Sequence, residues 1–209
     1  MERTTNIESI KEIFENNFIG LKELTSIAKH MKISVDTLEP PIPYSIDQLI
    51  KFRDTHLLIL GVSWMQNGKP VTLKSLRDHF GIDPYLSEPC FYNQDWYLNE
   101  EFINYQLANK WFLISKNIID ESKGKSPGIL IQKYKFPSSI LCAYTFFVCW
   151  FYLSEPLWSN DYIWCNDIDH LGDQIYVGRY FDINKTNKNG FSIHRHLSIK
   201  NNYGCITIF

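Results

Sequence analysis

Hydrophobic residues in the first quarter of the chain recur at the spacing of an amphipathic helix. Ile10, Ile13 and Phe14 share one helical face, and a second apolar stripe runs from residue 21 to residue 31. A capping box that begins at Ser45 opens a third helical segment. The pattern therefore predicts a helical N-terminal quarter.

The middle of the chain mixes two kinds of pattern. Residues 56–65 and 111–119 are short segments, dense in apolar side chains and bounded by turn residues, which predicts two buried strands. Between them, Thr72 can cap a helix that ends before Gly81. We therefore expect a mixed α and β middle region.

Further strands are predicted in the last quarter, at residues 162–165, 174–183, 191–199 and 205–209. Short turns separate them, and no helical pattern lies between them. Consecutive strands joined in this way pair as an antiparallel sheet. We therefore expect a C-terminal antiparallel sheet.

An uncharged apolar stretch, residues 140–153, precedes these strands and reads ILCAYTFFVCWFYL. A membrane-spanning helix needs roughly 17–25 apolar residues, so this stretch is too short to span. Ser138 or Ser139 can cap it. A helix that is apolar on every side belongs in the centre of a core. The expected fold is α+β, with the C-terminal antiparallel sheet packed on a buried apolar helix at 139–153.

Length and composition narrow the class of protein. We expect a single domain over residues 1–209, with a weak boundary at most in the loop-like segment 120–128. The formal net charge of -2 gives no reason to expect a general DNA coat or a polybasic membrane protein. The 16 lysines against 5 arginines predict a low-GC, bacterial genome. Five widely spaced cysteines and an N-terminus without an apolar signal predict a cytoplasmic protein with reduced thiols.

Aromatic residues make up 15% of the chain, and several of them fall in predicted loops, most densely at 91–97. Tyrosine and tryptophan anchor protein interfaces because they bury large areas at a small entropic cost. The alternative is that these rings fold back over the core. We predict an aromatic, mildly acidic binding surface made of Tyr92, Asp95, Trp96, Tyr97 and Trp158.

A second hypothesis rests on a His-Arg-His motif near the C-terminus. Residues two apart in a strand point to the same face, so His194 and His196 could bind one metal ion. If the hairpins pair, Asp167, Asp169 and His170 could complete a site for a divalent transition metal in an enzyme. The alternative is ordinary turn chemistry, with both histidines on the solvent face.

A third hypothesis places single-stranded nucleic acid on the lysine-rich region 110–135. Its lysines are interleaved with Trp111, Phe112 and Tyr134, and basic groups beside stacking faces can follow a single strand. The alternative is a solvated loop in a lysine-rich proteome. We rank nucleic-acid binding below the other two hypotheses.

The sequence has no nucleophile elbow, P-loop or dinucleotide-binding motif, which favours a protein without catalytic activity or cofactor. Residues 1–100 carry 10 basic and 14 acidic side chains, so an acidic and aromatic half is available to face a partner. The expected function is a non-catalytic protein-binding module of the inhibitor, immunity or accessory-subunit type. Its expected partner is another protein, and no membrane contact is expected.

Overall fold

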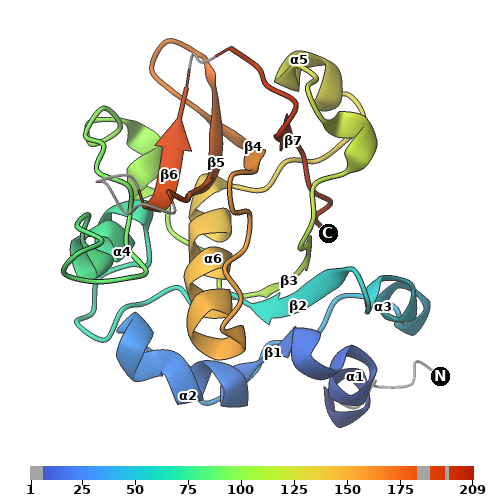
Figure 1. Ribbon diagram of the computed structural model, residues 1–209. Helices are drawn as coiled ribbons and strands as arrows, with labels where there is room; N and C mark the ends of the chain where they lie inside the picture. The colour runs from blue at the N-terminus through green and yellow to red at the C-terminus, as the bar shows by residue number, and fades with distance from the viewer. Residues whose placement is uncertain (1–6, 183–188, 196–197) are drawn as a thin grey trace.

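The computed structural model describes residues 7–182, 189–195 and 198–209, and it has helices packed around two small sheets (Figure 1). This arrangement confirms the predicted α+β class. The helices are α1 (Ile7–Phe14), α2 (Leu21–Met31), α3 (Ile46–Phe52), α4 (Leu73–Phe80), α5 (Pro127–Leu130) and α6 (Ser139–Leu153), with 3-10 turns η1 (Glu15–Asn17), η2 (Glu101–Asn104) and η3 (Asp120–Ser122). The strands are β1 (Phe18–Ile19), β2 (His56–Leu60), β3 (Trp111–Ser115), β4 (Tyr162–Ile168), β5 (Gln174–Tyr180), β6 (Gly190–His194) and β7 (Tyr203–Gly204).

Helix α6 is the buried apolar helix that the sequence predicts, and it runs through the centre of the molecule (Figure 1). The Ser138 hydroxyl caps it by accepting a hydrogen bond from the backbone N–H of Leu141, at 3.3 Å. Every residue from Ser139 to Cys149 is buried. Within the described residues, no helix combines the length and the apolarity that a membrane crossing needs.

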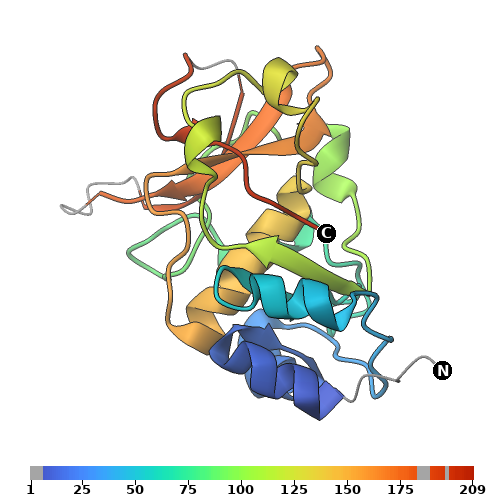
Figure 2. The same cartoon turned by 90° about the vertical axis from the view of Figure 1, so that its right-hand side faces the viewer.

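The first sheet has the strand order β1-β2-β3, with β1 parallel and β3 antiparallel to β2. The C-terminal tail runs along the other edge of β3 (Figure 2). There the backbone N–H of Ser115 donates to Thr207, at 2.9 Å, and the N–H of Phe209 donates to Leu113, at 3.0 Å. The tail therefore covers an edge that would otherwise expose unpaired backbone groups.

The second sheet has the order β6-β5-β4-β7, and β4, β5 and β6 form the predicted antiparallel meander. The prediction of a wholly antiparallel sheet is wrong at β7, which pairs parallel to β4. The reason is topological, because the chain leaves β6 at one edge of the sheet and returns at the opposite edge. Strand β6 also ends at His194, short of the predicted residue 199, and residues 196–197 lie outside the described part of the chain.

The two faces of the second sheet have different neighbours. Apolar residues such as Ile163, Val177 and Ile193 point inward and join the core around α6. Tyr162 and Tyr176 point outward into a smaller cluster that includes a leucine of α5. The larger cluster draws on both sheets, which is what a single domain requires. The single domain over 1–209, and the weak boundary at 120–128, stay predictions.

Tyr144 links α6 to the first sheet, because its hydroxyl donates a hydrogen bond of 2.9 Å to the carbonyl oxygen of Leu60. Burial also raises the pKa of Tyr144, so the hydroxyl keeps its proton. We predict that Tyr144→Phe lowers the free energy of unfolding by about 1–2 kcal/mol, measured by urea denaturation. Tyr105→Phe, at a half-exposed ring, is the control and should change nothing measurable. Equal stability of Tyr144→Phe and wild type would contradict the link.

Candidate functional site

Residues 90–100, which we call the edge segment, cover the open edge of β6. The N–H of Tyr92 donates to Phe191, and the N–H of Phe191 donates to Cys90, both at 2.9 Å. A Cβ atom at Gly190 would lie 2.6 Å from the backbone of the edge segment, so only glycine fits there. The predicted binding loop therefore acts first as a cover for a sheet edge.

Side chains of the edge segment continue this pairing toward the end of β6. The Oε1 atom of Gln94 accepts the N–H of Ile193, at 3.3 Å, and the indole N–H of Trp96 donates to the Ile193 carbonyl, at 3.0 Å. The guanidinium of Arg195 lies 4.5 Å from the centroid of the Trp96 ring. The polar atom of Trp96 is thus already used inside the protein.

The predicted aromatic surface is only partly exposed. Tyr97 and Trp158 are 2% and 5% exposed, so the expectation that they form a binding surface is wrong. Trp158 turns inward because its indole N–H donates to the carbonyl of Lys116, at 3.0 Å. Tyr92 and Trp96 are half-buried, and Asp95 is exposed. The rings fold back over the core, as the alternative interpretation held.

Asp95 also has a partner within the protein. Its carboxylate lies 2.6 Å from the guanidinium of Arg77 on α4. The side chain of Asp95 is 72% exposed, so this ion pair contributes little stability. Asp95 therefore remains reachable from solvent, although the aromatic residues around it do not form a continuous exposed face.

A group of charged side chains fastens the edge segment to the β4–β5 turn. Glu100 accepts hydrogen bonds from the backbone N–H of His170, at 2.9 Å, and pairs with the His170 ring, at 2.7 Å. The Nη1 atom of Arg195 lies 3.3 Å from Glu100 and 2.6 Å from Asp169. We call these four residues the arginine cluster. It ties three segments that are far apart in the sequence.

The electrostatics of Asp169 follow from its surroundings. Burial raises the pKa of its carboxyl, but the N–H groups of Asp173 and Leu171 and the guanidinium of Arg195 outweigh burial and hold the pKa below its ordinary value. The carboxylate is therefore ionised, and it shapes the turn by accepting both backbone N–H groups. The turn chemistry that the sequence offered as the alternative is thus realised.

Glu100, Asp169 and His170 are close enough to share a metal ion, with ligand atoms within 4.8 Å of one another. The guanidinium of Arg195 already supplies the positive charge that such an ion would bring. No residue pattern in the sequence pointed to Glu100, because its partner His170 lies 70 positions away.

The structure brings together part of the predicted metal-ligand set, because Asp169 and His170 lie beside one another, whereas Asp167 and His194 have other partners. Asp167 accepts the backbone N–H of Ser139 at the start of α6, and burial raises the pKa of its carboxyl. His194 lies on the outer face of the sheet, opposite Tyr176 in the β5–β6 register. Its neighbour Arg195 contacts Asp169. His196 lies outside the described residues.

The cysteines offer no nucleophile. All five are buried and unpaired. Burial raises the pKa of the Cys90 thiol to about 12, and the charges of Glu88 and Asp83 act in the same direction. The ring of the nearest preceding histidine, His79, contacts the carbonyl oxygen of His30, at 2.6 Å.

In the lysine-rich region 110–135, two of the three rings named for stacking are buried, and Tyr134 is half-buried. Trp111 and Phe112 are 1% and 7% exposed, so the expectation that they offer stacking faces is wrong. Lysines of this region pair with nearby carboxylates, including Lys123 with Asp120, at 2.8 Å. Nucleic-acid binding through this region stays a prediction that these two buried rings do not support.

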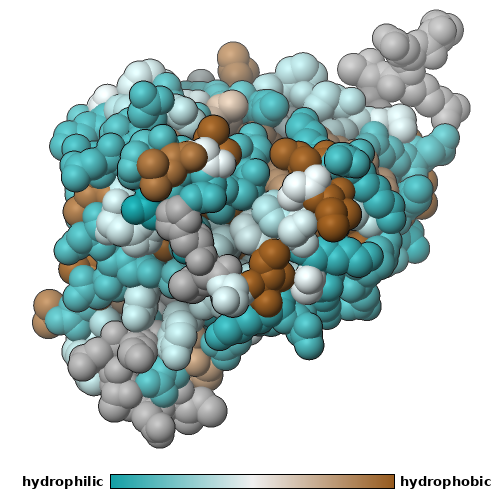
Figure 3. Space-filling model, turned by 90° about the horizontal axis from the view of Figure 1, so that it is seen from above, coloured by the Kyte–Doolittle hydropathy of each residue, from teal (hydrophilic) through white to brown (hydrophobic). Residues whose placement is uncertain are grey.

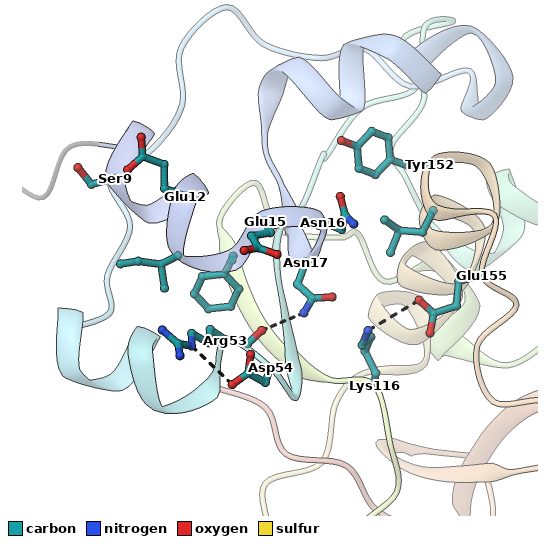
Figure 4. A pocket seen from close by; sticks show the side chains of 13 residues that line it. Ser9, Glu12, Glu15, Asn16, Asn17, Arg53, Asp54, Lys116, Tyr152 and Glu155 are labelled. Atoms are coloured by element: carbon teal, nitrogen blue, oxygen red, sulfur yellow. Dashed lines mark hydrogen bonds and ion pairs between the residues drawn. The ribbon is translucent and has the colours of Figure 1, made fainter.

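A large hollow lies between the N-terminal helices and the end of α6, and we call it the acidic groove. It encloses about 1090 Å3 and is open to solvent. Figure 4 shows its labelled side chains. They come from α1 and η1, from the turn after α3, from the residue that follows β3 and from the end of α6: Ser9, Glu12, Glu15, Asn16, Asn17, Arg53, Asp54, Lys116, Tyr152 and Glu155.

Negative charge predominates in the acidic groove. Its two cations are engaged locally, Arg53 with Asp54 at 3.5 Å and Lys116 with Glu155 at 3.8 Å. Two more carboxylates, those of Glu12 and Glu15, are exposed and have no ion pair among the described residues. A positively charged group entering the groove would therefore meet carboxylates without an internal partner.

Exposed apolar residues do not form a continuous face at the α5 end of the molecule. Seen from that end, the apolar side chains form separate patches among hydrophilic ones (Figure 3). Ile129 on α5 and Leu171 in the β4–β5 turn are 64% and 68% exposed. Single exposed apolar residues of this kind are normal on protein surfaces.

Comparisons with protein-family models, with curated proteins and with solved structures found no match to this chain. Statements about function therefore rest on the geometry and the chemistry of the chain itself. The acidic groove combines a large volume with two carboxylates, those of Glu12 and Glu15, that have no ion pair among the described residues.

The arginine cluster predicts a strong dependence of stability on Arg195. Removing its guanidinium takes away a positive charge that compensates Glu100 and Asp169, whose side chains are 6% and 0% exposed. We predict that Arg195→Met lowers the free energy of unfolding by about 3 kcal/mol, measured by chemical denaturation. Arg53→Met, which breaks an exposed pair, should cost less than about 1 kcal/mol.

A triple variant separates charge from packing. Adding Glu100→Gln and Asp169→Asn to Arg195→Met removes the uncompensated charges, so part of the lost stability should return. A triple variant that is no more stable than Arg195→Met would show that the guanidinium acts through packing on Trp96 alone.

Proposed function

We propose that this protein is a non-catalytic protein-binding module of the inhibitor, immunity or accessory-subunit type. Its acidic groove receives a basic segment of a partner protein. The observation that carries the proposal is the pair of carboxylates, Glu12 and Glu15, which line the groove without an ion pair to any residue that the structure describes. Electrostatic complementarity of this kind speeds association and selects a partner by the sign of its charge.

The backbone at Glu15 supports a recognition role. Glu15 has φ of 49°, a left-handed conformation that favours glycine and costs a glutamate on the order of 1 kcal/mol. The conformation lies where α1 ends and η1 begins, and it places Glu15 in the lining of the groove. Glutamate at this position, where glycine would cost less, favours a role for its carboxylate in the groove.

The state of the thiols and charged clusters supports a binding role over catalysis. Buried cysteines with raised pKa values do not act as nucleophiles at neutral pH. The carboxylates of the arginine cluster are compensated by a guanidinium, which leaves less reason to bind a metal ion. The metal-dependent alternative and the expected absence of a cofactor both stay predictions.

A cytoplasmic location belongs to the same proposal. Five reduced thiols suit a compartment in which glutathione and thioredoxin keep cysteines reduced. The partner would then be another protein of the same compartment.

We predict that an octalysine peptide binds the wild-type protein at low salt and that Glu12→Gln/Glu15→Gln weakens this binding about three- to tenfold. Each exposed carboxylate contributes a fraction of a kcal/mol to the attraction, so two together give this range. Isothermal titration calorimetry measures the affinity. Raising the ionic strength should weaken wild-type binding because salt screens exposed charges.

The matched control is Glu101→Gln/Asp47→Asn, which removes two exposed carboxylates outside the groove and gives the same net charge. Amide chemical-shift changes on peptide addition should map to α1, η1 and the end of α6. An equal loss of affinity in the control variant, or shifts concentrated elsewhere, would overturn the groove as the binding site.

A further inference from the structure

The outer face of the second sheet holds another hollow, which we call the tyrosine pocket. It encloses about 250 Å3, and the rings of Tyr92, Tyr162, Tyr180 and Tyr203 line it. Tyr92 and Tyr180 are half-buried and stacked, with ring centroids 5.7 Å apart and an interplanar angle of 26°. Pockets for drug-sized ligands enclose roughly 300–1,000 Å3, so this one has room for a single planar ring system.

His194 also lines the pocket, and its hydrogen bonds fix where its proton lies. The N–H of Ile193 can only donate, so the Gln94 atom that it meets at 3.3 Å is the oxygen, Oε1. The amide nitrogen of Gln94 therefore lies 3.1 Å from Nδ1 of His194, and Nδ1 must accept.

The neutral ring of His194 thus carries its proton on Nε2. Burial lowers the pKa of His194 to about 4, which keeps the ring neutral at pH 7. Nε2 has no hydrogen-bond partner among the residues that the structure describes. The pocket therefore has an N–H donor without a partner beside four aromatic faces.

The charge of the pocket favours an anionic ligand over a cationic one. With His194 neutral, Lys200 is the one charged side chain among the described residues that line the pocket. Tyrosine rings alone would also attract a cation, but Lys200 opposes one by like-charge repulsion. An anionic group is favoured at the same place.

We propose that the tyrosine pocket binds a planar aromatic ring that carries a hydrogen-bond acceptor and a negative charge. The ring stacks on tyrosine, the acceptor takes the N–H of His194 Nε2, and the anion lies near Lys200. Nucleoside monophosphates and aromatic carboxylates share this chemistry. The site goes beyond the proposed function, because the tyrosine pocket and the acidic groove share no lining residue.

The test is calorimetric titration of the full chain with adenosine monophosphate, with benzoate and with tetramethylammonium. We expect at least one of the two anionic probes to bind with Kd below about 1 mM and tetramethylammonium to bind more weakly. His194→Phe and Lys200→Gln should each weaken the bound probe about fivefold, since each removes one polar contact. Lys29→Gln, at an exposed lysine of α2 outside the pocket, should leave the affinity unchanged.

Binding of adenosine monophosphate alone assigns the pocket to nucleotides, and binding of benzoate alone assigns it to aromatic acids. Lys200 is exposed, so Lys200→Gln keeps the test open even if His194→Phe does not fold. The proposal is overturned by no saturable binding of either anion, by tighter binding of tetramethylammonium, or by an affinity that Lys200→Gln leaves unchanged. None of these results bears on the acidic groove.

Discussion

The structure depends on one constraint, which is that α6 has no polar face. Every residue from Ser139 to Cys149 is buried, so the helix needs apolar cover on all sides. The second sheet covers one side, α2 and α4 contact others, and Tyr144 reaches the first sheet through Leu60. Small sheets of short strands have only marginal stability by themselves, and packing on a shared helix stabilises both sheets.

The need to close the second sheet explains the aromatic residues of the edge segment. An open edge strand exposes unpaired backbone groups, and the edge segment meets those of β6 with its own backbone, with Gln94 and with Trp96. The arginine cluster then fastens the far end of the edge segment to the β4–β5 turn. Aromatic residues that suggested a partner surface are therefore largely structural. Two hollows remain, and each is lined by a polar group that has no partner among the described residues. One is acidic and open, and the other is lined by tyrosines.

Local patterns in the sequence predict local structure well and distant contacts poorly. Helix α2 and the capped, buried α6 follow from apolar spacing and capping residues, which neighbouring positions determine. The parallel pairing of β7 depends on which sheet edge the chain returns to, and no local pattern encodes that choice. The same holds for Glu100, whose partners His170 and Arg195 are remote in sequence. The alternation of residues along β6 predicted that His194 and His196 share one face of the strand. It could not show that Arg195 would contact Asp169 in the β4–β5 turn.

The central claim is that α6 makes the two sheets one cooperative unit. Native-state hydrogen exchange over a series of denaturant concentrations tests this claim most directly. Amides of β2, α6 and β5 should exchange with the same free energy of opening and the same dependence on denaturant, both equal to those of global unfolding. Exchange of the β4–β6 amides through an opening that leaves β2 and β3 protected would contradict the claim, because the sheets would then unfold separately.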